Sequence, residues 1–339
     1  MRFLICGLGS IGRRHLNNLT ALGQEDVVLF RTGNSTLPDA PLAGLPIEND
    51  LGTALDRWRP ECVVVSNPTA LHLPTALAAA KAGCHLLIEK PVSHTLEGIG
   101  DLQAAVRASG SRVLVGYHFR FNPGLQWVER LLGQGTIGRV LRATAHWGEY
   151  LPDWHPWEDY RKSYSARPEL GGGVLLTLSH PFDYLRWLLG EFGEISAEAK
   201  TSEALGLDVE DWAEVELRSS SDASVNVHLD YLQKPPSHWL EIEGSEGKLR
   251  WESDSSEVRW ATSGEANDQT HAAPAGFERN DMFLAEMRHF IDVAGGRADP
   301  VCGLEDGVKA LQIALTARES ARSGGKMELT RSGWRELEP

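Results

Sequence analysis

The first twelve residues constrain the fold of this chain most strongly. An apolar run from Phe3 to Cys6 leads into Gly7, Gly9 and Gly12, and a segment of helical character begins at Ile11. This order predicts a buried strand, a tight turn and a helix N-terminus, whose free N–H groups attract phosphate. Gly7 permits the turn, Gly9 lets a pyrophosphate approach the backbone, and Gly12 lets helix and strand pack closely. A glycine turn without a ligand is the alternative. The predicted dinucleotide contacts here are Gly7, Gly9, Ser10, Ile11 and Gly12.

The composition limits the class of protein. The chain has 339 residues, so two domains are expected, and its net charge of −14 argues against nucleic-acid or anionic-membrane partners. No apolar run reaches membrane-spanning length, and the first strand leaves no room for a signal peptide. The four cysteines are scattered, and neither they nor the histidines show metal-ligand spacing. We therefore expect a cytoplasmic protein without a metal site.

Strands and helices alternate through the first third of the chain. Apolar runs at 62–66, 85–89 and 112–115 are separated by segments with helical apolar spacing. This alternation predicts an α/β fold with a doubly wound parallel sheet, in which ligands bind beyond the carboxyl ends of the strands. The candidate residues that follow these runs are Asn67, Lys90, Tyr117 and His118.

The second strand, Val27 to Phe30, ends without the carboxylate that holds the ribose 2′-OH of NAD in many such folds. Arg31 and Thr32 follow instead. An arginine at this point can bind the 2′-phosphate of NADP(H), so the sequence slightly favours NADP(H) over NAD(H), which stays the alternative. The alternative is that Arg31 is a solvated surface residue.

Beyond residue 120 the pattern changes to alternation with a period of two, as in residues 213–218 and 225–231. Such strings predict an α+β domain with a large, mostly antiparallel open sheet that has one covered face. A sheet of this kind favours a homodimer or homotetramer formed through its uncovered face. The Ser-, Asp- and Gly-rich piece from Ser253 to Gly276 is expected to be an exposed loop.

An aromatic and polar stretch lies at residues 150–164. Aromatic rings with nearby hydrogen-bonding groups suit a sugar, which has an apolar face and a polar rim. An aromatic interface loop in an oligomer is the alternative. The candidate substrate contacts are Trp154, His155, Trp157, Tyr160, Arg161 and Tyr164.

A triple glycine at 171–173 precedes a second candidate cluster. Thr177, His180 and Asp183 are spaced by three, so on a continuous helix they share one face. Pro181 can offset the start of that helix. A single histidine is more often structural than catalytic, so a catalytic role for His180 needs support from the rest of the chain.

Together these motifs resemble the Gfo/Idh/MocA oxidoreductases over nearly the whole chain. The resemblance implies a Rossmann domain at 1–119, a substrate-binding and oligomerisation domain at 120–339 and an active site between them. It also implies hydride transfer between a nicotinamide and a sugar or cyclitol carbon. The aromatic stretch resembles a subgroup from surface-polysaccharide or sialic-acid-like sugar pathways. The motifs that carry the resemblance are the glycine turn, Asn67-Pro68 with His72, Glu89-Lys90-Pro91, Arg120 with Pro123, the segment 135–138 and the glycines before His180.

The resemblance also implies residue roles. Lys90 would bond the reacting hydroxyl, and His180 would exchange its proton, as imidazoles do near neutral pH. The implied cofactor contacts are Asn67, Pro68, His72, Glu89 and Lys90, and the implied substrate contacts are Tyr117, His118, Arg120 and His180.

One departure from the family pattern concerns Thr177, because the family usually has an aspartate there. A threonine carries no charge to stabilise an imidazolium, although Asp183 could compensate. Two alternatives therefore stay open: a non-catalytic cofactor-binding regulator or partner protein, and a glycosidase that uses its nicotinamide only transiently.

Overall fold

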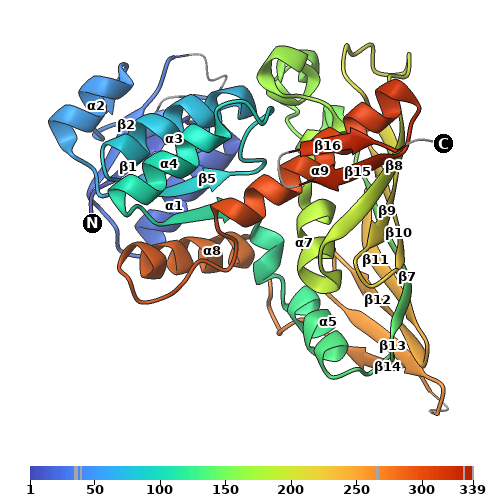
Figure 1. Cartoon of the computed structure of the whole chain (residues 1–339). Helices are drawn as coiled ribbons and strands as arrows, with labels where there is room; N and C mark the ends of the chain where they lie inside the picture. The colour runs from blue at the N-terminus through green and yellow to red at the C-terminus, as the bar shows by residue number, and fades with distance from the viewer. Residues whose placement is uncertain (34–36, 39, 265–266, 331–332, 338–339) are drawn as a thin grey trace. The chain divides into compact units, whose positions relative to one another are not determined.

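The computed structural model describes residues 1–33, 37–38, 40–264, 267–330 and 333–337 of the chain (Figure 1). It divides into an N-terminal unit, Met1–His118 with Arg279–Val308, and a C-terminal unit, Phe119–Glu278 with Lys309–Pro339. The expected division into 1–119 and 120–339 placed residues 279–308 in the second domain, whereas here they group with the first. Helix α8, Arg279–Ala294, makes the difference, because it packs on α1 and on strands β5 and β6 of the N-terminal unit.

The N-terminal unit is built on a six-stranded parallel sheet in the order β3-β2-β1-β4-β5-β6. The central strands are completely buried apolar runs, as expected when both faces of a sheet are covered. The order reverses between β1 and β4, which is where such sheets bind ligands. The strands are β1 Phe3–Cys6, β2 Val27–Phe30, β3 Ile47–Glu48, β4 Cys62–Val65, β5 His85–Glu89 and β6 Val113–Gly116.

Helices cover this sheet: α1 Ser10–Ala21, α2 Leu51–Trp58, α3 His72–Lys81, α4 Ile99–Ser109 and α8. The sequence from Thr95 to Ser109 has the apolar spacing of a helix, but α4 begins only at Ile99. Gly98, its N-cap, has a φ of 79°, a left-handed conformation that interrupts the helical pattern. The doubly wound α/β prediction is confirmed.

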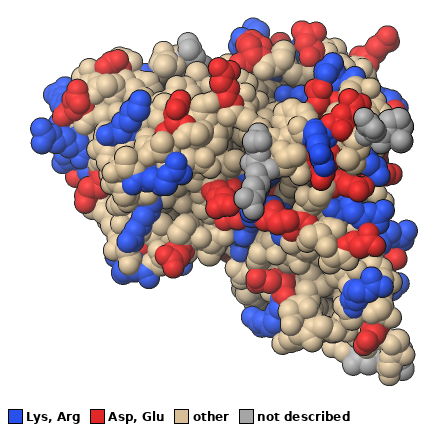
Figure 2. All heavy atoms as spheres, viewed as in Figure 1, with Lys and Arg blue, Asp and Glu red and all other residues tan. Residues whose placement is uncertain are grey.

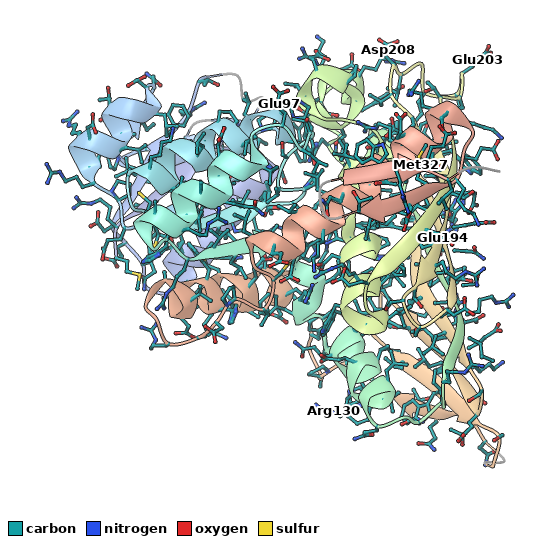
Figure 3. All side chains as sticks on the ribbon, in the orientation of Figure 1. Glu97, Arg130, Glu194, Glu203, Asp208 and Met327 are labelled. Atoms are coloured by element: carbon teal, nitrogen blue, oxygen red, sulfur yellow. The ribbon has the colours of Figure 1, made fainter. Side chains whose placement is uncertain are left out.

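The C-terminal unit holds a ten-stranded sheet in the order β14-β13-β12-β11-β7-β10-β9-β8-β15-β16. Strands β7 and β10 are parallel, and the other neighbours are antiparallel. The strands are β7 Val140–Gly148, β8 Phe192–Lys200, β9 Trp212–Ser219, β10 Ser224–Asp230, β11 Ser237–Gly244, β12 Gly247–Glu252, β13 Val258–Thr262, β14 Gln269–His271, β15 Met327–Thr330 and β16 Gly333–Glu336. Figure 3 labels Glu194 on β8 and Met327 on β15, two paired strands.

One face of this sheet is covered and the other is half exposed. In β9, Ala213, Val215 and Leu217 are buried, whereas the residues between them are not. Helix α6 packs against β9 and β10, and α5 packs against β12 and β13. The predicted open, mostly antiparallel sheet is therefore confirmed. The helices of this unit are α5 Pro123–Gly133, α6 Val174–Thr177, α7 His180–Leu189 and α9 Leu304–Ser323, of which α9 begins in the N-terminal unit.

The expectation of an exposed loop from Ser253 to Gly276 is wrong for most of that segment. It contains β13 and β14, and the side chains of Val258 and Trp260 are buried. The Trp260 ring lies 6.2 Å from that of Trp127 on α5. The alternation Val258-Arg259-Trp260 is short and surrounded by turn-forming residues, which concealed the strand.

Among the residues that the structure describes, no helix is both long and apolar enough to cross a membrane. Acidic and basic side chains are interspersed on the face shown in Figure 2.

Candidate functional site

The turn between β1 and α1 has the geometry of a phosphate cradle. Gly7 has a φ of 99°, and a Cβ at Gly7 would lie 2.5 Å from the main-chain nitrogen of Asn67. A Cβ at Gly12 would lie 1.9 Å from the carbonyl oxygen of Gly7, whereas no described atom lies within 4 Å of a Cβ at Gly9. The turn is therefore tight on its inner side and open at Gly9.

Helix α1 leaves its N-terminus available to a ligand. Its N-cap is Gly9, no described side chain caps it, and its first turn has no acidic residue. Ser10 is exposed and Ile11 is half-buried. The N–H groups of this first turn, together with the open space at Gly9, fit a pyrophosphate.

His72 joins the ends of two strands. Its Nδ1 lies 2.8 Å from the carbonyl oxygen of Pro91, and its Nε2 lies 2.8 Å from that of Asn67. Burial lowers the pKa of His72, although both hydrogen bonds oppose this shift. The ring thus fixes the segments after β4 and β5, and with them Pro68, which precedes the short helix Thr69–Leu71.

The Glu89–Lys90 turn is held from within the N-terminal unit. His15 Nε2 lies 2.6 Å from Glu89 Oε1, and the Lys90 main-chain N–H donates to Glu89 Oε2 at 3.3 Å. Burial acts to raise the pKa of Glu89, but the His15 hydrogen bond and the neighbouring positive charges outweigh it and lower that pKa. Glu89 is therefore a buried carboxylate, and Lys90 lies half-buried directly after β5.

Two further candidates follow β6. Tyr117 is buried, and the His118 ring stacks on Phe283 of α8 at 4.0 Å. Burial, reinforced by the charges of Arg279 and Lys90, holds the pKa of His118 well below its usual value, so the ring is neutral at pH 7.

Arg31 and Thr32 follow β2, where Arg31 is half-buried and Thr32 is exposed. The Arg31 main-chain N–H donates to the carbonyl oxygen of Glu48 at 3.1 Å. This bond extends the pairing of β2 with β3 and fixes the backbone of Arg31 at the end of the strand.

In the C-terminal unit, Thr177, His180 and Asp183 do not lie on one continuous helix; the offset at Pro181, the other arrangement that the sequence left open, is the one found. Helix α6 ends at Thr177, and α7 begins at His180. Proline lacks the N–H that would continue the helical hydrogen bonding, so Pro181 is accommodated in the first turn of a new helix. The side chains of Thr177, His180 and Asp183 are all buried.

Arg120 and Asp183 form a buried bidentate ion pair. Arg120 Nε donates to Asp183 Oδ2 at 2.9 Å, and Nη2 donates to Oδ1 at 2.8 Å. The guanidinium also lies 5.4 Å from the centre of the Trp187 ring. Because both carboxylate oxygens accept from Arg120, the geometry does not favour Asp183 as a substitute for the aspartate that Thr177 replaces.

His180 sits among aromatic rings, and four residues of this cluster were missed from the sequence: Phe119, Trp147, Tyr184 and His238. The His180 ring lies 4.9 Å from that of Phe119 and 5.5 Å from that of Trp147. Trp147 stacks at 4.3 Å on His238, which also lies 3.2 Å from the Tyr184 hydroxyl. His238 precedes Leu240 and Ile242 in the alternation of β11, and extending that pattern by one step finds it.

The aromatic stretch at 150–164 does not form one cluster. The Tyr160 hydroxyl donates to the carbonyl oxygen of Leu205 at 3.0 Å, and the Arg161 guanidinium lies 4.6 Å from the Tyr160 ring centre. Trp157 is 53% exposed. The others are Trp154, 5.5 Å from the Tyr231 ring, His155, 3.0 Å from Glu158, and Tyr164, half-buried at the start of a short helix.

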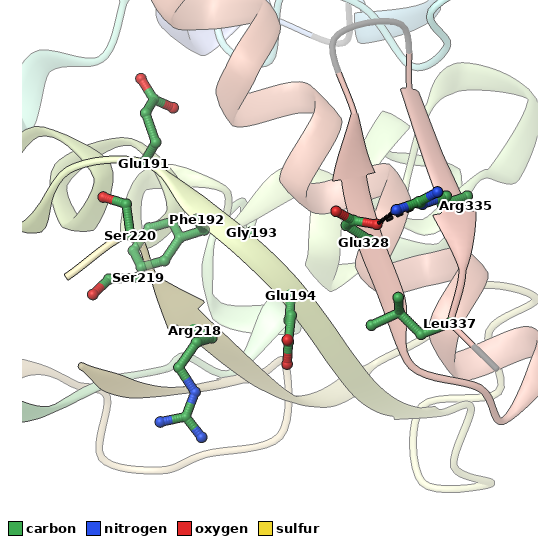
Figure 4. A pocket seen from close by; sticks show the side chains of 10 residues that line it. All are labelled: Glu191, Phe192, Gly193, Glu194, Arg218, Ser219, Ser220, Glu328, Arg335 and Leu337. Atoms are coloured by element: carbon green, nitrogen blue, oxygen red, sulfur yellow. Dashed lines mark hydrogen bonds and ion pairs between the residues drawn. The ribbon is translucent and has the colours of Figure 1, made fainter. Parts of the chain in front are cut away.

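A separate open hollow of about 480 Å³ lies by β8, β9, β15 and β16 (Figure 4). It is lined by residues of both charges, and Glu328 and Arg335 form an ion pair. None of its lining residues is a predicted site residue, so it adds nothing to the candidate site.

Comparison with known proteins decides the family. A family model described as an oxidoreductase family with an NAD-binding Rossmann fold matches residues 1–117, and the GFO/IDH/MocA C-terminal domain matches residues 125–250. The chain belongs to the Gfo/Idh/MocA family. The resemblance expected from the motifs is thereby confirmed, and the cradle at Gly7 to Gly12 lies within the NAD-binding region.

Relatives in the Gfo/Idh/MocA family have sugar and cyclitol names. The chain is 28% identical to 1,5-anhydro-D-fructose reductase of Ensifer adhaerens, covering 79% of this chain and 80% of that one. It is 27% identical to myo-inositol 2-dehydrogenase of Thermotoga maritima, covering 97% and 98%. The solved complex of levoglucosan dehydrogenase with NADH and levoglucosan shares the fold, with a TM-score of 0.84, 21% identity and coverage of 97% and 99%.

Two glycine substitutions should separate folding from cofactor binding. We expect Gly12→Ala to destabilise the N-terminal unit, because its Cβ would overlap the Gly7 carbonyl oxygen. Gly9→Ala should fold normally but bind NAD(H) about 10-fold or more weakly, because the methyl group occupies the open side of the turn. Thermal melts and fluorescence titration with NADH measure the two effects. Equal losses of stability in both variants would contradict the assignment of Gly12 to helix packing and of Gly9 to cofactor binding.

Proposed function

We propose that the chain transfers hydride between a bound nicotinamide and a hydroxyl or keto carbon of a sugar, sugar derivative or cyclitol. The observation that carries the proposal is the Glu89–Lys90 turn, held at the end of β5 in the NAD-binding unit by His15. The names of the relatives support the substrate class, and those with anhydro-sugar names make anhydro-sugars good first candidates.

The proposed mechanism divides the work between two side chains. When bound, the nicotinamide supplies the hydride chemistry. The Lys90 ammonium donates a hydrogen bond to the reacting oxygen and stabilises the negative charge that develops there. His180 takes the proton from that oxygen during oxidation and returns it during reduction.

Turnover on a substrate panel tests this function. Purified protein is mixed with NAD⁺ or NADP⁺ and neutral sugars, anhydro-sugars, cyclitols, uronic acids and sialic-acid-like sugars, and reduced nicotinamide is followed by absorbance. Keto-sugars with NADH or NADPH test the reverse direction. Turnover on at least one member supports the proposal.

A non-catalytic cofactor-binding protein is the second candidate. It is favoured by Thr177 in place of the usual aspartate and by the pairing of Asp183 with Arg120. Tight NAD(H) binding with no turnover on any panel member, in either direction, would support this candidate instead.

We further propose a slight preference for NADP(H), because Arg31 follows β2 where a carboxylate would contact NAD. Replacing Arg31 by alanine should weaken NADP(H) binding about 10- to 100-fold, the usual loss for a charge-assisted hydrogen bond, and leave NAD(H) binding nearly unchanged. The exposed Arg107→Ala on α4 is the matched control. Fluorescence titration with both reduced cofactors measures the change, and an equal effect on the two would contradict this role.

Two further proposals concern the oligomeric state of the protein and its cellular compartment. The half-exposed face of the ten-stranded sheet, where His146 stacks on His228 and Trp239, supports a homodimer or homotetramer that sedimentation equilibrium would distinguish. The four cysteines, all buried and unpaired, support a reducing compartment such as the cytoplasm.

A further inference from the structure

Glu286, on α8 of the N-terminal unit, is a buried acid that the proposed mechanism does not use. It is 0% exposed, and neither carboxylate oxygen has a hydrogen-bond partner among the described residues. An unpaired charged carboxylate is strongly disfavoured in such a place, so its surroundings must accommodate it.

Glu286 is connected to Lys90 through Glu89. One oxygen of Glu286, one of Glu89 and a ring nitrogen of His15 all lie within 4.8 Å of one another. Glu89 itself accepts from His15 on one oxygen and from the Lys90 N–H on the other. Glu286 therefore lies close to the carboxylate that accepts a hydrogen bond from the Lys90 main chain.

The charges at this cluster favour one proton on the carboxyl pair. Burial, with the charge of Glu89 adding to it, raises the pKa of Glu286 well above its usual value, whereas that of Glu89 is lowered. The cationic or titratable groups that act on Glu89 are His15, His72, Lys90 and Arg14. Two carboxylates this close disfavour each other's charge, and the opposite directions of the two shifts point to Glu286 as the group that keeps its proton more readily.

The same three side chains form a possible ligand set for a metal ion. However, two ligands that are each about 2.0–2.2 Å from one metal ion lie roughly 3 Å apart. The separation of 2.6 Å between His15 Nε2 and Glu89 Oε1 is that of a hydrogen bond. The geometry thus favours a direct hydrogen bond between His15 and Glu89 over a metal ion between them.

We propose that Glu286 keeps a proton and acts as a positioning residue for Lys90, which it reaches through the neighbouring Glu89. The functional importance of this position rests on the proposed role of Lys90. The proton itself and the order of the Lys90 backbone can be measured without cofactor or turnover.

The test compares Glu286→Gln and Glu286→Leu with Asp292→Asn, a control at a part-exposed acid on the same helix. Infrared spectra at neutral pH should show a protonated-carboxyl band in the wild type and in the control but in neither Glu286 variant. Amide hydrogen exchange at Lys90, followed by NMR, should be about tenfold faster in Glu286→Leu. Glutamine has the size and the zero charge of a protonated glutamate, so Glu286→Gln should keep the exchange rate close to that of the wild type.

Absence of the carboxyl band from the wild type would overturn the proposal, as would unchanged Lys90 exchange in Glu286→Leu. One equivalent of tightly bound metal by elemental analysis, lost in Glu286→Gln, would overturn it in favour of a metal site. If Glu286→Leu does not fold, the carboxyl band in the wild type and its loss in Glu286→Gln still decide whether Glu286 carries the proton. Where the panel shows turnover, Glu286→Leu should lower kcat about tenfold with little change in KM for the cofactor. A protein without turnover would refute the proposed function and leave the infrared and exchange results intact.

Discussion

Replacing Lys90 by methionine is expected to lower kcat by about 10²- to 10³-fold while NAD(H) affinity stays within about twofold. Methionine retains most of the length of the side chain but removes the charge and the hydrogen-bond donor. The main-chain N–H of residue 90 can still donate to Glu89, so the turn after β5 should keep its position. Steady-state kinetics on the best panel substrate, with NADH titration, measures the two quantities.

Lys81→Met is the matched control for this prediction, because Lys81 is an exposed lysine at the end of α3 in the same unit. It should leave both kcat and cofactor affinity unchanged. Unaltered turnover in Lys90→Met would refute the proposed mechanism, and a parallel loss of NADH binding would instead give Lys90 a part in holding the cofactor.

Breaking the Arg120–Asp183 pair should cost about 3–5 kcal/mol of stability in the C-terminal unit. Both side chains are almost fully buried and joined by two hydrogen bonds, so Asp183→Asn or Arg120→Ala leaves one charge without its counter-ion. Urea unfolding, followed by tryptophan fluorescence, measures the loss.

The exposed pair Arg142–Glu243, on strands β7 and β11 of the same unit, supplies the control, with side chains that are 56% and 42% exposed. Arg142→Ala should change stability by about 1 kcal/mol or less. The double variant Arg120→Met with Asp183→Asn should recover part of the loss, because it removes the unpaired cation. A loss in Asp183→Asn no larger than that in Arg142→Ala would show that the buried pair is not needed for folding.

Local patterns predicted those features that depend on neighbouring residues. The glycine turn, the buried parallel strands and the alternating strands followed from spacing alone, because a period of two or a Gly-x-Gly-x-x-Gly turn is a property of a short segment. The strand at Val258–Thr262 was missed because two buried side chains are too few to show a period.

Features that join distant parts of the chain could not be predicted in the same way. Asp183 lies 63 residues from Arg120, and nothing in the sequence around either residue identifies the other as its partner. The break between Thr177 and His180 depended on how Pro181 is accommodated, which spacing by three cannot decide. Glu286 reads as an ordinary acidic position of an amphipathic helix, and its burial appears only once α8 is placed on the N-terminal unit.

The return of residues 279–308 to the N-terminal unit has a consequence for synthesis on the ribosome. Helix α8 supplies buried Met282, Phe283, Met287 and Phe290, and the Phe290 ring lies 6.5 Å from that of Phe3 on β1. The nascent sheet of the first 118 residues must therefore wait for its last covering helix while the strands from β7 to β14 are translated. During that interval an apolar surface of the unfinished unit is open to chaperones, and the C-terminal unit is unfinished as well, because it includes Lys309–Pro339.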